Sequence, residues 1–272
     1  MEKIAVLTLV KDRHEALANL IKGLELGSMH PDELIVVFMN EHPCKLPDTS
    51  FPIITHSLLS EELLPLAKAR NYAASKSNAQ YLIFLDVDCI PGQHLVAGYA
   101  DAMDETSLFS GQIRYLIQQA QFKSFSDSAL AELSDPDPIR ANLKELPYAL
   151  FWSLNFACSR VTYNRIGGFD ESFTGYGGED TDFAFTAEQK GILLRTIDVT
   201  AYHQYHASYS PPLNHFDDIL KNTRVFKQKW NKWPMEGWLK RFEKMGLVRI
   251  SDSELIRLKS PHQNEIDACL KR

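Results

Sequence analysis

Two acidic residues that follow an apolar run have the types and spacing of a metal site. Asp86 and Asp88 come directly after residues 81–85 and are separated by Val87 alone. Because side chains alternate along an extended chain, Asp-Val-Asp directs two carboxylates to the same point. Carboxylate oxygens suit Mg²⁺ and Mn²⁺, which keep open positions for phosphate oxygens. The pattern predicts a divalent-cation site; the alternative is that both acids only end a strand and cap the next turn.

A second acidic cluster follows a glycine-rich stretch. Gly177 and Gly178 permit a sharp turn and a close approach of the backbone to a ligand, and Glu179 and Asp180 come next. A carboxylate in a cleft can take the proton of an attacking hydroxyl, and the start of a helix would keep it ionised. The alternative is a capping cluster that satisfies backbone N–H groups. No Gly-Lys-Ser or Gly-Lys-Thr follows, so a Walker-type phosphate loop is excluded.

Two histidines follow another strand-like run. A neutral imidazole can complete the coordination shell of a metal held by carboxylates. If the strand continues, His203 and His206 point to different faces, so only one of them needs to be a ligand.

The elements that must position these residues alternate along the chain. Strands are expected at residues 3–10, 33–39, 52–56, 81–85, 108–115 and 193–199. Helices are expected after Asp12 as the cap, and at residues 61–77, 93–103, 178–191 and 214–230. This order predicts an α/β fold with right-handed crossovers and a mostly parallel sheet, which binds ligands beyond the carboxyl ends of its strands.

Composition limits the class of protein. The 272 residues, 44% of them hydrophobic, can bury a large core, and a net charge of −6 without a basic stripe argues against nucleic acid as partner. The four cysteines lack metal or disulfide spacing, which favours free thiols. The short apolar run at the N-terminus and the lack of a spanning segment predict a cytoplasmic protein, with peripheral contact on the inner face of the membrane left open.

The chain is expected to divide into one domain at residues 1–250 and a tail at 251–272. Within the domain, residues 1–115 would bind the donor, 118–147 would be an insertion or mobile loop, and 148–250 would carry catalysis and the acceptor. Three tryptophans near the end, with neighbouring lysines, could contact a sugar or a lipid surface, but packing on the core is favoured: Trp230, Trp233 and Trp238.

Three blocks in order carry a family resemblance: VLTLVKDR, AKARNYAASKSNAQYLIFLDVDCIPG and GGFDESFTGYGGEDTDF. Together they resemble nucleotide-sugar glycosyltransferases of the GT-A fold over about residues 1–210, with a gap over the central segment. The first two blocks are similar to family 2 enzymes. The third is similar to the signature of β-galactosyltransferases and polypeptide N-acetylgalactosaminyltransferases. The resemblance implies a Rossmann-like, mixed and mostly parallel sheet flanked by helices, with a C-terminal helical extension.

The resemblance also implies roles for single residues. Asp86 would lie near the ribose, Asp88 would bind Mn²⁺ or Mg²⁺, and His203 or His206 would be a further ligand. Asp180 would be the base of an inverting transfer, with Glu179 holding the sugar. The implied donor-binding set is Thr8, Val10, Arg13, Asn40, Glu41, Arg70, Asn71, Asp86, Val87, Tyr176, Gly177 and Gly178. In it, Asn40 or Glu41 replaces the paired aspartates of family 2, and Tyr176 replaces a tryptophan.

The implied reaction moves a hexose or N-acetylhexosamine from UDP-Gal, UDP-GalNAc or a related nucleotide-sugar. The acceptor would be the hydroxyl of a glycan, a lipid-linked sugar or a small molecule. Two other functions stay open. A nucleotidyltransferase could use the same acids, and a non-catalytic nucleotide- or carbohydrate-binding module could keep the fold without turnover.

Overall fold

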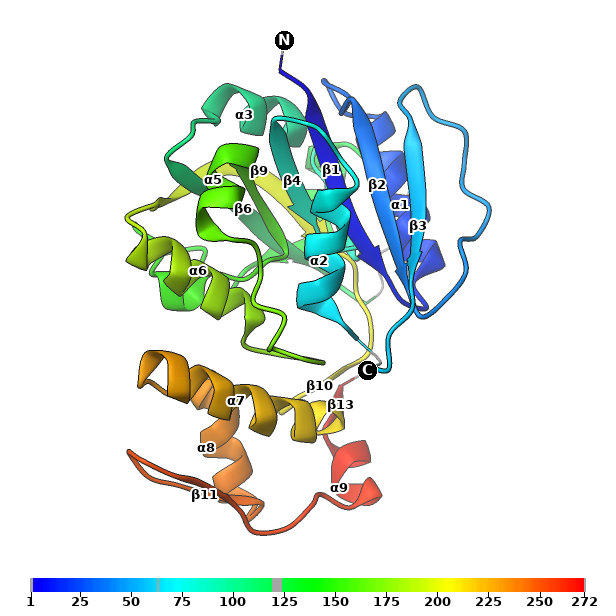
Figure 1. The fold of residues 1–272 in the computed structure, drawn as a ribbon. Coiled ribbons are helices and arrows are strands. Elements are labelled where there is room, and N and C mark those ends of the chain that lie inside the picture. The colour runs from blue at the N-terminus through cyan, green and yellow to red at the C-terminus, as the bar shows by residue number, and fades with distance from the viewer. Residues whose placement is uncertain (1, 63, 119–123, 272) are drawn as a thin grey trace.

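The centre of the protein is a twisted mixed sheet, seen in a computed structural model that describes residues 2–62, 64–118 and 124–271 (Figure 1). Its strands run in the order β3-β2-β1-β4-β8-β6-β9-β5, and β7 pairs with β6. Apolar, β-branched runs build the middle of it, as expected for strands covered on both faces. The bounds are β1 Ile4–Val10, β2 Glu33–Met39, β3 Ile53–Leu58, β4 Tyr81–Leu85, β5 Cys89–Pro91, β6 Ser107–Leu116, β7 Ser134–Pro136, β8 Asn155–Ser159 and β9 Leu193–His203.

Pairing in the sheet changes direction at β8. Strands β3, β2, β1 and β4 are mutually parallel, β8 is antiparallel to both β4 and β6, and β6 is parallel to β9. The carboxyl ends of β1, β2 and β4 therefore meet at one edge. β9 is longer than the predicted 193–199 and ends at His203, where it pairs with Cys89 of β5. This pairing brings the two histidines to the acidic turn after β4.

Helices cover both faces of the sheet (Figure 1). On one face, α1 (His14–Glu25) and α3 (Leu95–Ala102) pack on a core that includes Leu20 and Tyr99. On the other, α2 (Leu66–Ser75), α5 (Arg160–Ile166) and α6 (Glu179–Gln189) pack on a core that includes Phe156 and Phe183. The sheet is thus the middle of three layers, and helices bury the side chains on both of its faces.

Two predicted helix starts are wrong. Asp12 does not cap α1: it has φ 55°, and the helix begins at His14 after Arg13. The helix predicted over residues 61–77 is only Leu66–Ser75, because Pro65 precedes it and disfavours helical backbone in the residue before it.

The C-terminal segment forms a further layer below the sheet edge (Figure 1). It contains η2 (Leu213–His215), α7 (Phe216–Trp230), α8 (Glu236–Lys244), β11 (Val248–Ile250), β12 (Leu255–Arg257) and α9 (Gln263–Ala268). Phe216, Phe242 and Leu255 belong to its own hydrophobic cluster. The last strand, β13 (Leu270–Lys271), pairs with β10 (Ser208–Tyr209), so residues predicted as a tail return to the strand that follows the sheet.

The segment predicted as an insertion or mobile loop contains regular structure. α4 (Asp127–Glu132) begins at the N-cap Ser126, and β7 pairs with β6. Residues 119–123 of that prediction lie outside the described residues. Within the described ranges, no helix has both the length and the apolar character needed to cross a bilayer.

Candidate active site

A cavity of about 1460 Å³ lies between the carboxyl ends of the parallel strands and the C-terminal layer. It is large for a single small-molecule pocket, whose volume is commonly about 300 to 1,000 Å³. Most of the predicted site residues line it: Arg13, Arg70, Asp86, Val87, Asp88, Tyr176, Gly177, Gly178, Glu179, Asp180, His203 and His206. Residues up to 193 positions apart in the sequence therefore share one cavity.

Asp86, Val87 and Asp88 lie on a turn between β4 and β5. The prediction of an extended segment is wrong, because the Cys89 N–H donates to the Asp86 carbonyl at 2.9 Å and reverses the chain. Both carboxylates still face the cavity, but toward different partners. Asp86 faces Arg70, and Asp88 faces Arg13 and His206.

Asp88, His203 and His206 form a cluster that could hold a metal ion. Their ligand atoms lie within 4.8 Å of one another. Desolvation lowers the pKa of His203 to about 4, against the opposing charge of Asp88, so its imidazole is neutral at pH 7, as a metal ligand must be. The two histidines were expected to point to different faces if the strand continued. Strand β9 instead ends at His203, and the chain then brings His206 Nε2 to 3.7 Å from Asp88 Oδ2, so both histidines can be ligands. One carboxylate and two imidazoles suit Mn²⁺.

Arg70 joins two of the predicted acids. Its Nη1 donates to Glu179 Oε1 at 3.0 Å, and its Nη2 lies 3.5 Å from Asp86 Oδ1. Burial raises the pKa of Asp86 to about 6, although the Arg70 charge opposes the shift. Among the described residues, the second oxygen of Glu179, Oε2, is buried and has no hydrogen-bond partner. A buried unpaired carboxylate oxygen is costly, so this atom is suited to accept from a ligand hydroxyl.

Asp180 has the properties of a general base. It lies in the first turn of α6, and its Oδ1 accepts from the Thr181 N–H at 2.7 Å. The helix start was expected to keep Asp180 ionised, but burial and the neighbouring Glu179 charge raise its pKa to about 7. A base is most efficient with a pKa near the working pH. Gly177 and Gly178 precede it with φ 95° and 92°, a backbone region that favours glycine.

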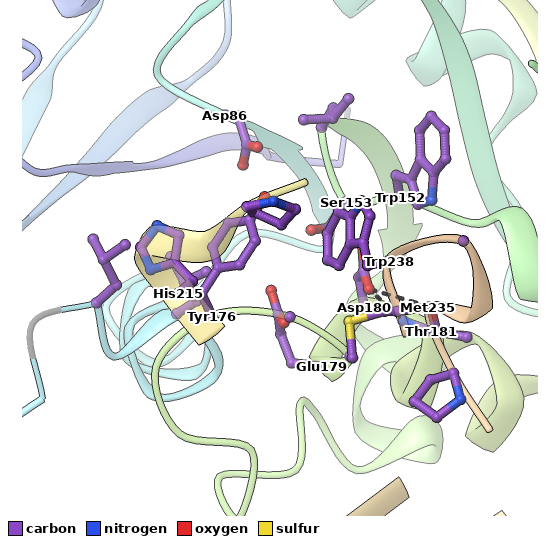
Figure 2. Close-up of a pocket in the computed structure, with 18 of the residues that line it drawn as sticks. Asp86, Trp152, Ser153, Tyr176, Glu179, Asp180, Thr181, His215, Met235 and Trp238 are labelled. Atoms are coloured by element: carbon purple, nitrogen blue, oxygen red, sulfur yellow. Dashed lines mark hydrogen bonds between the residues drawn. The ribbon is translucent and has the colours of Figure 1, made fainter. Parts of the chain in front are cut away.

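Part of the cavity wall comes from the C-terminal layer, which contacts Tyr176 of the glycine-rich segment. Tyr176 stacks on His215 with ring centroids 4.3 Å apart and on Trp238 at 6.0 Å. Figure 2 shows Asp86, Tyr176 and His215 on one side of the cavity, with Asp180, Trp152 and Trp238 on the other. Of the three C-terminal tryptophans, Trp233 and Trp238 pack on the C-terminal hydrophobic cluster, as predicted, and also line the cavity. Trp230 donates to Asp182 at 2.7 Å.

The fold is similar to the folds of known proteins. A solved structure of S. aureus TarS residues 1–349 in complex with UDP matches with a TM-score of 0.54 and 13% identity, covering 83% of this chain and 65% of that one. GalNAc-T7 with UDP, GalNAc and Mn²⁺ matches with a TM-score of 0.55 and 16% identity, covering 90% of this chain and 54% of that one. The chain has the GT-A fold.

Sequence comparisons agree with this fold. The family model for the N-terminal domain of galactosyltransferase matches residues 139–208 of the GT-A chain. Validoxylamine A glucosyltransferase of Streptomyces hygroscopicus subsp. jinggangensis (strain 5008) is 28% identical over 152 residues, 47% of this chain and 36% of the relative. Chondroitin synthase of Pasteurella multocida (strain Pm70) is 38% identical over 79 residues, 29% of this chain and 8% of the relative. The alignments thus span about a third or less of these relatives, the first of which is a glucosyltransferase by name.

Five predicted donor residues are not among the described residues that line the cavity of the GT-A chain. Thr8 and Val10 point into the sheet core, and Leu9 and Lys11 face the cavity instead. Asn40 accepts from the Ser60 N–H and donates to the Glu62 carbonyl, and Glu41 accepts from the Asp12 N–H.

Asn71 is occupied within the protein. Its Oδ1 accepts from the Phe169 N–H and from the Tyr163 hydroxyl, and its Nδ2 donates to the Phe169 carbonyl and to Glu171. It fixes the glycine-rich segment to α2 in the GT-A chain, a bracing position behind the site.

Several cavity residues of the GT-A chain were not predicted from the sequence: Lys11, Trp152, Ser153, Thr181, His215 and Met235. No motif surrounds Trp152 or His215, and their place depends on contacts between distant segments. Of these residues, Thr181 could have been predicted from the sequence, because it directly follows the predicted base.

Proposed function

We propose that the protein is a metal-dependent inverting glycosyltransferase that moves a sugar from a nucleotide-sugar, with a UDP-sugar favoured, to an acceptor hydroxyl. One observation carries the proposal. A single cavity joins a metal-type cluster, Asp88 with His203 and His206, to Asp180, whose pKa is about 7. The fold and the glycosyltransferase relatives support the same reaction class. The GGFDE…GYGGED segment, which contains Asp180, lies within the match to the galactosyltransferase model and supports a hexose or N-acetylhexosamine donor.

On the donor side, Asp88, His203 and His206 would hold Mn²⁺. The bound ion would supply positive charge to stabilise a leaving diphosphate. Arg13, whose Nε is 3.9 Å from Asp88, adds a cation beside the same position. Asp86 would accept from the ribose, and the unpaired Oε2 of Glu179 would accept from a donor sugar hydroxyl.

On the acceptor side, Asp180 would remove the proton of the attacking hydroxyl. The acceptor oxygen forms a bond to the anomeric carbon as the bond from that carbon to the diphosphate oxygen breaks. The proton stays on Asp180, the electron pair leaves on the nucleoside diphosphate, and attack from the opposite face inverts the configuration. General-base catalysis of this kind contributes about 10² to 10⁴ in rate.

The test is turnover on a panel of UDP- and GDP-sugars with Mn²⁺ and simple glycoside acceptors. Release of a nucleoside diphosphate that depends on Asp88 and Asp180 supports the proposal. In a parallel assay with UTP or GTP and a sugar 1-phosphate, release of pyrophosphate with formation of the nucleotide-sugar would favour the nucleotidyltransferase. Binding of the nucleotide without turnover of any sugar would favour the binding module.

A further inference from the structure

The acceptor side of the cavity carries two tryptophans, each of which contacts another side chain that holds it in place. Arg140 lies over the ring of Trp152 at 4.3 Å and is itself fixed by an ion pair of 2.8 Å to Asp137. Trp238 is held by its stacking on Tyr176. Both tryptophans line the cavity, on the Asp180 side in Figure 2. A sugar ring has an apolar C–H face, and contact with an aromatic ring removes that face from water at little entropic cost.

Two lysines line the same cavity, and each lies over a further aromatic ring. Lys232 lies over the ring of Phe185 at 5.2 Å, and Phe185 is one helical turn from Thr181, the residue after the proposed base. Lys227 lies over the ring of Trp233 at 4.8 Å and donates to the Asn231 carbonyl at 3.1 Å. All of these side chains line the same cavity. Asp180 and the two lysines are thus accessible to one ligand in the same cavity.

Neither lysine has an ion-pair partner among the residues that the structure describes. Within the described part of the chain, no ion pair involves Lys227 or Lys232, whereas their neighbour Lys229 is paired with Asp170 and Asp182. Of the acids on the same side of the cavity, Glu236 is paired with Lys240, whereas Asp252 and the proposed base Asp180 have no ion pair among the described residues. In a chain of net charge −6, the two lysines concentrate positive charge at one part of this wall. Such a surface favours an anionic ligand.

We propose that the acceptor is an anionic carbohydrate, whose ring lies against Trp152 and Trp238 and whose acid group is held by Lys227 and Lys232. The inference rests on the proposed function, since it identifies the acceptor class of the same site. The acid group is a carboxylate, as on a uronic acid, or a phosphate ester. Either is recognised by the same ammonium groups.

The experiment measures equilibrium binding by NMR titration of the whole chain in the presence of UDP and Mn²⁺. The probes are methyl β-glucoside, methyl β-glucuronide and methyl β-glucoside 6-phosphate, which differ only at carbon 6. The variant is Lys227→Met with Lys232→Met, which keeps the aliphatic stems. The control is Lys244→Met, an exposed lysine of α8 that is not among the cavity residues. UDP binding is measured separately for each protein.

At least one charged probe is expected to bind about five- to tenfold more tightly than the glucoside, since one exposed charge pair contributes up to about fivefold. The preference should disappear in the double variant, persist in the control and weaken with added salt. The charged probe that binds identifies carboxylate or phosphate as the source. Equal affinity for all probes, or a preference that survives the double variant, overturns the inference. If UDP binds but no probe does, the inference fails and the proposed function stands; if UDP does not bind either, both fail.

Discussion

Arg70 and Glu179 form a buried ion pair between α2 and α6. The Arg70 Nη1 lies 3.0 Å from Glu179 Oε1, and their side chains are only 5% and 7% exposed. The pair joins two helices on the same face of the sheet and sets the first turn of α6, where Asp180 lies. Removing one partner leaves the other as a buried charge without compensation.

Replacing Arg70 should therefore destabilise the protein strongly. In Arg70→Met, we expect the free energy of unfolding to fall by about 3 to 5 kcal/mol, because Glu179 and Asp86 lose their cation. Denaturant unfolding measures the change. The matched control is Arg195→Met, whose partner Asp104 is 3.6 Å away and whose side chain is 52% exposed. It should lose about 1 kcal/mol or less. Equal losses in the two variants would contradict the importance of burial.

Asp180→Asn should be more stable than the wild type at high pH. Burial raises the pKa of Asp180 from 3.8 to about 7, so the native state keeps a proton that the unfolded state releases. Stability from this group is complete below about pH 4 and is lost as pH rises to about 7. Asparagine is neutral throughout and avoids the loss. The advantage of the variant should grow with pH and level off above pH 7 at about 1 to 3 kcal/mol, discounted because the carboxyl is only half-buried.

Denaturant unfolding at several pH values measures this difference. A variant that is equally stable at every pH, or less stable at pH 8, would mean that Asp180 is ionised in the native protein without cost.

Binding of Mn²⁺ should depend on the cluster at the end of β9. Calorimetric titration of Asp88→Asn in the presence of UDP should show at least a tenfold weaker affinity for Mn²⁺ than wild type, because one of three protein ligands is lost. Asp101→Asn, an exposed acid of α3, serves as control and should bind like wild type. Chelation should abolish sugar transfer, and added Mn²⁺ should restore it. Unchanged Mn²⁺ affinity in Asp88→Asn would show that the ion does not bind at this cluster.

The hydrogen bond from Trp230 to Asp182 should hold α7 on α6. The Asp182 side chain is 1% exposed, and its carboxylate also accepts a hydrogen bond from the Lys229 ammonium group. Trp230→Phe should lower the free energy of unfolding by about 1.5 to 3 kcal/mol, as expected for a bond to a charged group. In Trp233→Phe, the lost bond goes to the Ser251 carbonyl at the surface, and the loss should be near 1 kcal/mol. If both variants lost the same free energy of unfolding, the bond to the buried Asp182 carboxylate would contribute no more than the bond at the surface.

Strands β1 and β2 were predictable from the sequence because residues 4–10 and 33–39 are short runs rich in apolar and β-branched residues, as in strands buried on both faces. Strands β5, β7 and β8 were not among the predicted strands. Helix α6 was predictable because Gly178 and Gly191 frame it, both with positive φ. The fold class was confirmed by the match to solved GT-A structures. Start positions were less certain, as at Asp12, since several residues near a helix start can compete to cap it.

The site was harder to derive, because its geometry depends on contacts between distant segments. The spacing of Asp86 and Asp88 led to an extended segment, whereas one hydrogen bond to Cys89 makes it a turn. His206 joins the cluster only because β9 ends where it pairs with β5. Trp238 reaches Tyr176 through the packing of the C-terminal layer, for which no local pattern exists. The individual roles of the site residues stay predictions.

The most direct measurement is NMR analysis of the anomeric configuration of the product from the best UDP-sugar, with rates for wild type, Asp180→Asn and the control Asp101→Asn. We expect an inverted linkage, a rate that falls by about 10² to 10⁴ in Asp180→Asn, and an unchanged rate in the control. A retained configuration, or an Asp180→Asn variant that transfers sugar at the wild-type rate, would contradict the assignment of Asp180 as the base.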